Sequence, residues 1–326
     1  MKLTRRIFVA AGSAAGVVAA APAILRAAEP MVVGYVPANA IYWDLDVAFD
    51  KGFFRAAGFD AEPSTMQSTP HSVQQAIVGA YQIAAAQPEG FVAAFERGAN
   101  NLGALAAPAN RADWYLVGQQ DIKTITDLKG KLIGVSTLNT GEVWMTRQLL
   151  EKGGLHKGDY DFLVSGLTPQ KVAALQKGSI AAAPLFQPSA ELTIRRGFPA
   201  LASYFAVRAY PPILYVVNKD WAAKNDAGKR VAQAIRKAHD WLWDPANKAE
   251  AVQILMKYTK REQAIVDKVY GDYFVDQKIC SRTGDIELSG FDRALADMAD
   301  DGQVVKNPPP PAAKYVLDRN LGGMWA

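Results

Sequence analysis

The sequence is poor in the side chains that bind metals and form disulfides. Cys280 is the only cysteine among 326 residues, so the chain forms neither an internal disulfide nor a cysteine-based zinc site. The three histidines, His71, His156 and His239, lie far apart and lack the spacing of metal ligands. We expect His156 and His239 at the surface, and we expect no bound metal and no cofactor.

Familiar catalytic motifs are also missing. The sequence has no Gly-Lys-Ser/Thr phosphate loop, no Gly-x-Gly-x-x-Gly, no Gly-x-Ser-x-Gly and no His-Glu-x-x-His. A Ser/His/acid triad stays open, because the members of a triad need not be neighbours in the sequence. We expect a protein that is not an enzyme.

No long apolar run follows the N-terminal segment, so no internal stretch is suited to span a membrane. Residues 1–28 read as an export signal. Arg5 and Arg6 precede an Ala/Gly-rich, mildly apolar run, and small residues near Ala27 suit cleavage. The pattern resembles a twin-arginine signal and predicts a periplasmic protein. An uncleaved helix or a tail anchor is the alternative, which the Ala/Gly content disfavours.

The net charge of +4 comes from this leader. It holds four basic residues and no acid, so removing it from a chain with 36 basic residues leaves 32, which equals the number of acidic residues. A mature chain without net charge gives no electrostatic footprint for DNA or RNA. We expect no nucleic-acid partner.

The most informative stretch is residues 121–155. Thr124 and Asp127 have the spacing of a helix cap, residues 131–136 form a short apolar strand, and residues 141–152 follow a polar loop as a long helix. The loop therefore lies at the carboxyl end of a strand. In open α/β sheets, ligands bind at that edge.

The rest of the chain repeats this alternation of strands and helices, which predicts an α/β fold with mostly parallel sheets. Strands are expected at residues 31–36, 59–63, 81–86, 102–107, 114–118, 132–136, 160–165, 180–185 and 213–218.

Two motifs carry a family resemblance. Residues 127–131 (Asp-Leu-Lys-Gly-Lys), followed by an Ile-Gly-Val strand, and residues 51–54 (Lys-Gly-Phe-Phe) resemble the periplasmic substrate-binding proteins of ABC importers, in the branch for nitrate, sulfonates, taurine and thiamine-pyrimidine precursors. The resemblance implies a type II periplasmic-binding-protein fold and a small-molecule ligand. It also implies a monomer that delivers its solute to an inner-membrane permease with its ATPase.

The two lobes of such a fold are assigned from two breaks in the chain. We expect crossings near residues 118–120 and near residues 210–212, which make a two-strand hinge. Lobe 1 then comprises residues 29–118 and 213–326, and lobe 2 comprises residues 119–212.

Five polar loops are expected to face the cleft between these lobes. In the binding hypothesis, two aromatic residues stack on the ligand, and the polar residues orient it from both sides. The candidate ligand-binding residues are Tyr42, Trp43, Gln67, Ser68, Thr69, Gln87, Glu89, Asn139, Thr140, Gly141, Glu142 and Gln187.

Each of these residues also has a purely structural interpretation. Tyr42 and Trp43 can seal the start of a helix. Ser68 and Thr69 can serve only as helix caps, and Glu142, three residues after Asn139, has the spacing of a capping box.

The helix entry departs from the sulfonate-binding pattern that it resembles. By this resemblance, Asn139 and Thr140 stand at the positions where those proteins carry a pair of hydroxyl residues, but Leu138 stands where they have a glycine. Glu89 and Glu142 bring negative charge to the site, which repels a bare oxyanion. We therefore expect a neutral or zwitterionic ligand with a flat or apolar part rather than nitrate.

Two other classes of function remain open. One is a pyrimidine-precursor-related enzyme on the same fold, which the lack of a His/Cys cluster in the sequence disfavours. The other is the ligand-sensing partner of a signalling system, which the lack of a membrane span after the leader disfavours.

Overall fold

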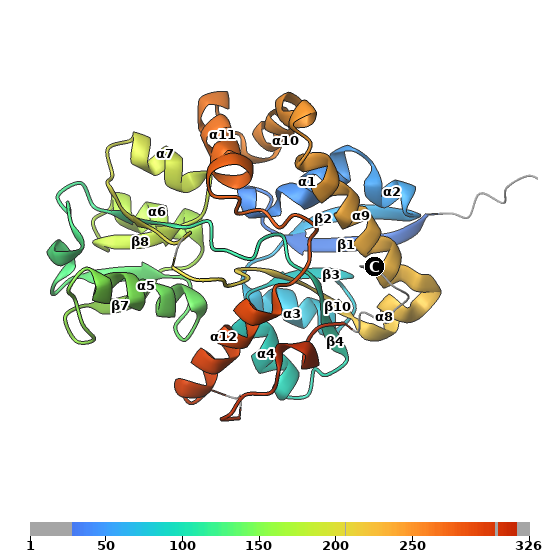
Figure 1. The fold of residues 1–326 in the computed structure, drawn as a ribbon, viewed down its shortest axis with the longest axis horizontal. Helices are drawn as coiled ribbons and strands as arrows, with labels where there is room; N and C mark the ends of the chain where they lie inside the picture. Colours follow the sequence, from blue (N-terminus) through green and yellow to red (C-terminus); the bar gives the residue numbers. More distant parts are fainter. Residues whose placement is uncertain (1–27, 206, 304–305, 318–326) are drawn as a thin grey trace, which may run out of the picture.

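A computed structural model of the chain describes residues 28–205, 207–303 and 306–317. It shows two lobes side by side along the long axis of the molecule (Figure 1). The predicted export signal falls outside the described residues except for Ala28, so it stays a prediction. No described helix has both the length and the apolar character needed to cross a membrane.

Lobe 1 is built on a five-stranded sheet in the order β2-β1-β3-β10-β4. Four strands run in one direction, and β10 runs antiparallel between β3 and β4. The strands are β1 (Glu29–Tyr35), β2 (Phe59–Thr65), β3 (Ile83–Ala86), β4 (Leu102–Ala106) and β10 (Leu214–Asn218).

Lobe 2 repeats this plan in the order β7-β6-β8-β5-β9, with β5 as the antiparallel strand. The strands are β5 (Tyr115–Gly118), β6 (Leu132–Val135), β7 (Asp161–Val164), β8 (Ala182–Leu185) and β9 (Ala200–Ser203). The sequence therefore predicts the α/β fold with mostly parallel sheets correctly.

The lobe boundary needs one correction. The sequence prediction places residues 114–118 at the end of lobe 1, but β5 pairs with β8 and β9 in lobe 2. The first crossing thus precedes Tyr115. The apolar run at residues 114–118 predicts a strand. Which sheet this strand joins depends on its pairing with segments that are far away in the sequence. The second crossing lies between β9 of lobe 2 and β10 of lobe 1.

Helices flank both sheets (Figure 1). Those that follow the strands of lobe 1 or belong to the C-terminal part are α1 (Trp43–Asp50), α2 (Phe53–Ala56), α3 (Thr69–Ile77), α4 (Pro88–Glu96), α8 (Lys219–Ala223), α9 (Ala227–Leu242), α10 (Lys248–Thr259), α11 (Gln263–Tyr270) and α12 (Leu288–Asp300). Lobe 2 has α5 (Gly141–Lys152), α6 (Thr168–Gln176) and α7 (Ser189–Arg195). Single 3₁₀ turns occur at Ala40–Tyr42, Ile125–Leu128, Lys224–Asp226, Pro245–Asn247 and Ala312–Lys314, and a six-residue π-helix, Gly271–Asp276, follows α11.

Local sequence explains where several helices begin and which face they bury. Thr124 and Asp127 form the predicted capping box. The predicted helix at residues 141–152 is α5. In α9, Val231, Ile235 and Leu242 recur on one face and are fully buried, as their spacing predicts.

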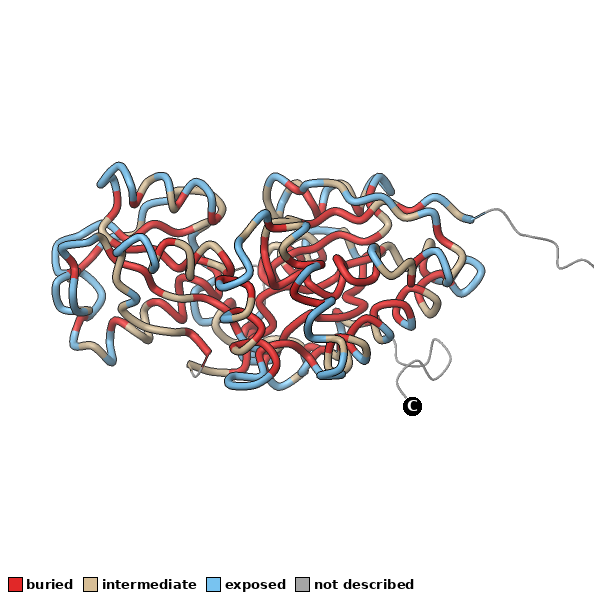
Figure 2. The backbone as a smooth tube through the Cα atoms, turned by 90° about the horizontal axis from the view of Figure 1, so that it is seen from above, coloured by how far each residue is buried: buried red, intermediate tan, exposed pale blue. Residues whose placement is uncertain are grey.

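An apolar core extends from one lobe into the other. The tube in Figure 2 is red inside both lobes and along the segments that join them. One cluster of buried residues includes Phe91 of lobe 1, Met145 of lobe 2 and Trp114 at the crossing. Trp114 makes edge contacts with Tyr204 and Tyr210, at ring-centroid distances of 5.4 and 6.1 Å. The first crossing is therefore packed into a core to which both lobes contribute.

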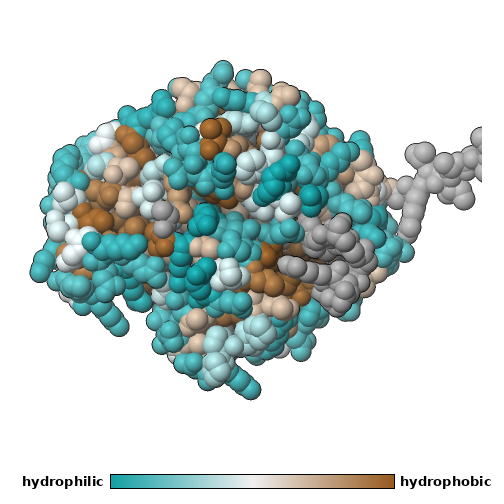
Figure 3. Space-filling view, in the orientation of Figure 1, coloured by the Kyte–Doolittle hydropathy of each residue, from teal (hydrophilic) through white to brown (hydrophobic). Residues whose placement is uncertain are grey.

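The outer surface is mostly hydrophilic on the face drawn in Figure 3, with small hydrophobic areas. Three of the exposed large apolar side chains, Leu132, Leu163 and Val164, lie on the neighbouring strands β6 and β7 of lobe 2.

Candidate functional site

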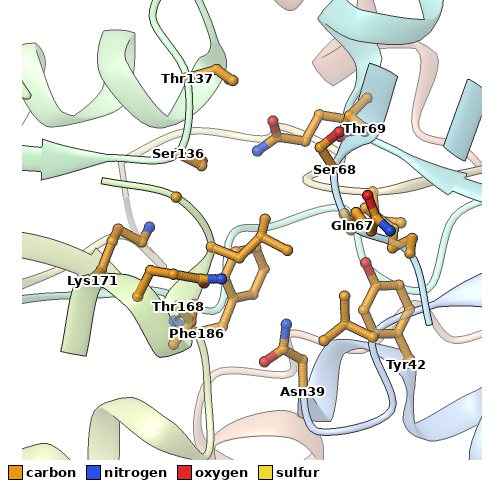
Figure 4. A pocket seen from close by; sticks show the side chains of 17 residues that line it. Asn39, Tyr42, Gln67, Ser68, Thr69, Ser136, Thr137, Thr168, Lys171 and Phe186 are labelled. Carbon is orange, nitrogen blue, oxygen red and sulfur yellow. Dashed lines mark hydrogen bonds between the residues drawn. The ribbon is translucent and has the colours of Figure 1, made fainter. Parts of the chain in front are cut away.

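A cavity of about 140 Å³ lies between the lobes, at the carboxyl ends of strands from both sheets (Figure 4). Its position agrees with the general rule for ligands of open α/β sheets. The residues that line it are Val36, Asn39, Tyr42, Met66, Gln67, Ser68, Thr69, Gln87, Ser136, Thr137, Gly166, Leu167, Thr168, Gln170, Lys171, Phe186 and Ile213.

The lobe 1 wall is positioned by the starts of two helices. Ser68, not Thr69, caps α3, since its hydroxyl accepts a hydrogen bond from the backbone N–H of His71 at 3.3 Å. The Thr69 hydroxyl accepts one from the backbone N–H of Gln87, also at 3.3 Å. This bond ties the entry of α3 to the entry of α4, where Gln87 is the cap residue.

Three side chains on this wall are buried and keep their polar groups free. Among the described residues, the side-chain amides of Asn39 and Gln87 and the hydroxyl of Tyr42 have no hydrogen-bond partner, although these residues are only 8, 8 and 2% exposed. Burial raises the pKa of the Tyr42 phenol, which therefore stays protonated and can donate. A ligand that supplies donors and acceptors would compensate the cost of burying these groups.

The lobe 2 wall carries a buried ion pair. Lys171 Nζ lies 2.5 Å from Glu142 Oε1, and both side chains are only 1% exposed. The other carboxylate oxygen of Glu142 accepts hydrogen bonds from the backbone N–H, at 3.2 Å, and the hydroxyl of Ser136. Among the described residues, Lys171 is the only charged one that lines the cavity, and its charge is neutralised by Glu142.

Phe186 supplies the aromatic surface of the lobe 2 side. It follows the last residue of β8 and packs edge-on against Trp114, with ring centroids 5.3 Å apart. Figure 4 shows it beside Thr168, whose hydroxyl accepts a hydrogen bond from the Phe186 N–H at 3.4 Å. Tyr42 lines the opposite side (Figure 4). The cavity thus combines apolar rings with uncharged polar groups.

Of the twelve predicted ligand-binding residues, five line the cavity. These are Tyr42, Gln67, Ser68, Thr69 and Gln87. Their contact with a ligand stays a prediction, and the other seven lie outside the lining.

Trp43 is packed into the core of lobe 1. It is 1% exposed, its ring makes edge contacts with Tyr270, Tyr273 and Phe274, and its N–H donates to the carbonyl of Ala251 at 3.1 Å. Successive helical residues point about 100° apart, so neighbouring aromatics at a helix start face different surroundings. The structural interpretation of Trp43 therefore replaces its predicted stacking role.

Gln187 also points away from the cavity. It is fully buried, its carbonyl accepts from the backbone N–H of Ala40 at 2.8 Å, and its side-chain oxygen accepts from that of Glu191 at 3.2 Å. The lining residue is its neighbour Phe186, because consecutive side chains at the end of a strand alternate in direction.

The predicted capping box at α5 does not form. Thr140 is the cap residue, and Glu142 turns to Lys171 and Ser136 instead. The Thr140 hydroxyl donates to the carbonyl of Thr137 at 3.3 Å. Asn139 has a left-handed backbone (φ 56°), and its carbonyl accepts from Gln303 at 3.0 Å. These contacts hold the loop without placing Asn139 at the cavity.

Gly141 and Glu89 meet across the lobes at the start of α5. The Gly141 N–H donates to the Glu89 carboxylate at 3.1 Å, and the Tyr210 hydroxyl donates to its two oxygens at 2.9 and 3.1 Å. Burial raises the pKa of Glu89 to about 7, although these hydrogen bonds oppose the shift. Gly141 is required here, because a Cβ atom would lie 2.2 Å from the Tyr210 ring.

Twelve lining residues lie outside the sequence prediction. Several belong to the turn at 166–171, which follows a parallel strand and opens a helix as the predicted loops do. The place of this turn between a parallel strand and a helix is the feature of the sequence that could have identified it as part of the site. Lys171 carries no such signal, because its approach to Glu142 joins residues 29 positions apart.

One buried cluster outside the cavity corrects two expectations. His239, expected at the surface, is fully buried, and its Nε2 lies 3.2 Å from Asp44. The Cys280 sulfur lies 3.5 Å from His239 Nδ1, so a His/Cys pair does form through long-range packing. Burial lowers the pKa of His239, but Cys280 and Asp44 outweigh it and raise the pKa to about 10. Within the described residues, no group of side chains is arranged to hold a metal ion.

Comparisons with known proteins agree with this architecture. A family model described as NMT1/THI5 like matches residues 43–249. One relative is a Brucella abortus protein described only as a binding protein. It is 25% identical over 312 residues, which cover 89% of this chain and 91% of that protein.

Two solved structures have the same fold. The alkanesulfonate-binding protein SsuA from Xanthomonas axonopodis, bound to MOPS, matches with a TM-score of 0.72 at 17% identity, over 88% of this chain and 98% of that one. The periplasmic nitrate-binding protein NrtA from Synechocystis matches with a TM-score of 0.72 at 16% identity, over 84% of this chain and 81% of that one. The two-lobed periplasmic-binding-protein fold is thereby confirmed.

Proposed function

The chain belongs to the NMT1/THI5-like family, and we propose that it is the solute-binding component of an ABC importer. In this proposal a small polar organic solute, similar to a sulfonate, taurine or a heterocycle, is captured between the lobes. No chemistry is done on it. The bound form is then delivered to an inner-membrane permease with its ATPase.

The cavity between the lobes is the observation that carries this proposal. Its lining comes from both lobes and combines two aromatic rings with uncharged polar groups. Asn39, Tyr42 and Gln87 offer hydrogen-bonding groups without partners among the described residues. Such a site suits reversible binding, because a ligand satisfies the wall groups and no activated nucleophile lies among them.

The two crossings support a binding cycle with hinge motion. The chain passes between the lobes before β5 and again before β10. Rotation about two strands can separate the lobes and admit a solute, and contacts with the solute from both walls then favour the closed form. We propose that the permease recognises this closed form, and that the protein acts as a periplasmic monomer exported by the twin-arginine route.

An enzymatic role is the second candidate, because Cys280 and His239 do cluster. The cluster also includes Asp44, which accepts a hydrogen bond from the Tyr215 hydroxyl at 2.7 Å. None of these four residues lines the cavity, and burial raises the pKa of the Cys280 thiol, which disfavours a reactive thiolate. The geometry therefore favours binding over catalysis.

A thermal-shift screen of the mature protein tests the proposed function. The panel contains alkanesulfonates, taurine, nitrate, small aromatic acids, pyrimidines and other heterocycles. A solute that binds the native state raises the melting temperature by mass action, by the equivalent of about 2.7 kcal/mol at a hundredfold excess over Kd. We expect at least one hit that is recovered unchanged. A hit that is consumed would instead assign an enzyme, and a panel without hits would contradict solute binding of these classes.

A further inference from the structure

We propose that Glu89 acts as an internal anion, filling the anion-binding end of α5 from the opposite lobe and thereby restricting the cavity to solutes without net negative charge. This inference rests on the proposed function and narrows its solute class: zwitterions such as taurine and neutral heterocycles stay within it, and simple alkanesulfonates, which are anions, fall outside it. Glu89 would then be a specificity-determining residue of the binding site, although it does not line the cavity.

The first support is the geometry at the start of α5. The free N–H groups at the start of a twelve-residue helix attract anions, because the helix dipole places partial positive charge there. In this protein the Gly141 N–H already donates to Glu89 at 3.1 Å, and Tyr210 donates to the same carboxylate. The anion that this helix end attracts is therefore part of the chain itself.

The space around this carboxylate is also filled. A Cβ atom on Gly141 would lie 2.2 Å from the Tyr210 ring, so the helix start and this ring are in close contact. Glu89 itself is 3% exposed. A sulfonate or carboxylate group of a ligand cannot reach the Gly141 N–H unless Glu89 leaves, and above pH 7, where the Glu89 carboxyl is ionised, that charge repels it.

The second, independent support is the neutralised cation in the cavity. Lys171 is the only charged residue in the part of the lining that the structure describes, and its ammonium group contacts Glu142 at 2.5 Å. The backbone N–H and the hydroxyl of Ser136 donate hydrogen bonds to the other oxygen of the Glu142 carboxylate. An anionic ligand would therefore meet no uncompensated positive charge among the described residues of the cavity wall, and removing its charge from water would be unfavourable.

The groups that remain available favour a neutral solute. Amide side chains such as Asn39 and Gln87 both donate and accept, and the Tyr42 phenol donates. Phe186 and Ile213 add apolar surface. The matching ligand is a small neutral molecule that carries N–H or O–H donors next to carbonyl-type acceptors, together with an apolar or planar part.

A rescue experiment with acetate and methanesulfonate tests the role of Glu89. In Glu89→Ala, the Gly141 N–H and the Tyr210 hydroxyl lose their acceptor, and a small added anion can occupy the vacated place. At pH 8, we expect either anion at tens of millimolar to raise the melting temperature of this variant by about 2 to 4 °C more than that of the wild type. Glu89→Gln, whose amide fills the same space, should gain no such shift.

The matched control is Asp46→Ala, which removes another fully buried carboxyl group. Asp46 accepts a hydrogen bond from Tyr35 at 2.9 Å within lobe 1 and does not meet a helix of the opposite lobe. The Asp46→Ala variant should show the same anion-induced change in melting temperature as the wild type. Equal shifts in Glu89→Ala and Asp46→Ala would overturn the internal-anion role, because they would reflect general salt stabilisation.

Titration calorimetry of the wild type provides a second test that needs no variant to fold. At pH 8, where the Glu89 carboxyl is ionised, we expect neutral hits from the solute screen to bind at least tenfold more tightly than analogues carrying a carboxylate or sulfonate. Tighter binding of the anionic analogue would overturn the inference while leaving a solute-binding protein in place. If no solute binds, the proposed function fails, and the rescue experiment still decides whether Glu89 occupies an anion site.

Discussion

Lys171 and Glu142 form a 2.5 Å ion pair on the lobe 2 wall of the cavity, and both side chains are almost completely excluded from water. The pair joins the start of α5 to α6 and is completed by Ser136. It fixes the shape of one cavity wall and at the same time makes that wall electrically neutral.

Replacing one member of this ion pair should lower the free energy of unfolding. Lys171→Met leaves the Glu142 carboxylate buried without its counter-charge, and such changes cost roughly 3 to 5 kcal/mol. Urea unfolding followed by circular dichroism measures this loss. The double variant Lys171→Met with Glu142→Gln should lose less than Lys171→Met alone, because no unpaired charge remains. A loss below about 1 kcal/mol for the single variant would show that water reaches the pair.

Substitutions of Trp43 and Phe186 should have different effects, the first on protein stability and the second on solute binding. Trp43→Ala removes a fully packed core side chain and should lower the free energy of unfolding by roughly 3 to 5 kcal/mol, while the folded fraction keeps its affinity. Phe186→Ala removes lining surface and should weaken solute binding at least tenfold.

The matched control for Phe186 is Phe162→Ala. Phe162 is a half-buried ring of lobe 2 on β7, outside the cavity lining. Calorimetry with a screened solute and urea unfolding give both quantities for each variant. Equal affinity of Phe186→Ala and Phe162→Ala would remove Phe186 from the binding site.

Glu89 should make stability depend on pH. Its pKa rises from 4.5 to about 7 in the fold, so between these values the native state holds a proton that the unfolded chain has released. Stability therefore falls as pH rises from about 5 to 7, by about 2 kcal/mol for this group. Tyr210 and Gly141 face the carboxylate directly, and Asp297 adds negative charge nearby.

The variant that isolates this effect is Glu89→Gln. Burial also raises the pKa values of Asp46 and Asp113. The dependence of the wild-type unfolding free energy on pH is therefore a sum over several groups, and the variant should lose only the contribution of Glu89. Urea unfolding at several pH values between 5 and 8 measures the slope. An unchanged slope would show that Glu89 does not titrate in this range.

Cys280 should behave as a core residue and not as a nucleophile. It is 6% exposed, and burial raises the pKa of its thiol. We expect iodoacetamide to modify it only after urea unfolding, as followed by mass spectrometry. Rapid modification of the native protein, accompanied by consumption of a screened solute, would favour the enzymatic alternative.

Local patterns in the sequence predict much of the fold. The alternation of strands and helices, the capping box of Thr124 and Asp127, and the bounds of α5 all follow from short-range chemistry. The assignment of β5 to lobe 2 does not, because it depends on pairing with β8 and β9.

The site is predicted less completely for the same reason. A polar loop at the end of a strand marks the correct region, but the direction of each side chain depends on one residue of register. Phe186 lines the cavity whereas Gln187 is turned into the protein, and Tyr42 lines it whereas Trp43 is core. Lys171 reaches the wall only through its long-range bond to Glu142.

The crystal structure of the wild-type protein with its best screened solute is the most direct test of the central claim. We predict that the solute lies between the lobes, with polar atoms within hydrogen-bond distance of Gln87 and of the Tyr42 hydroxyl, and with Glu89 still bonded to Gly141. A solute bound elsewhere, for example in the surface groove beside α10, would contradict the proposed binding site. A solute whose anionic group displaces Glu89 from α5 would keep the site and contradict the proposed selection against anions.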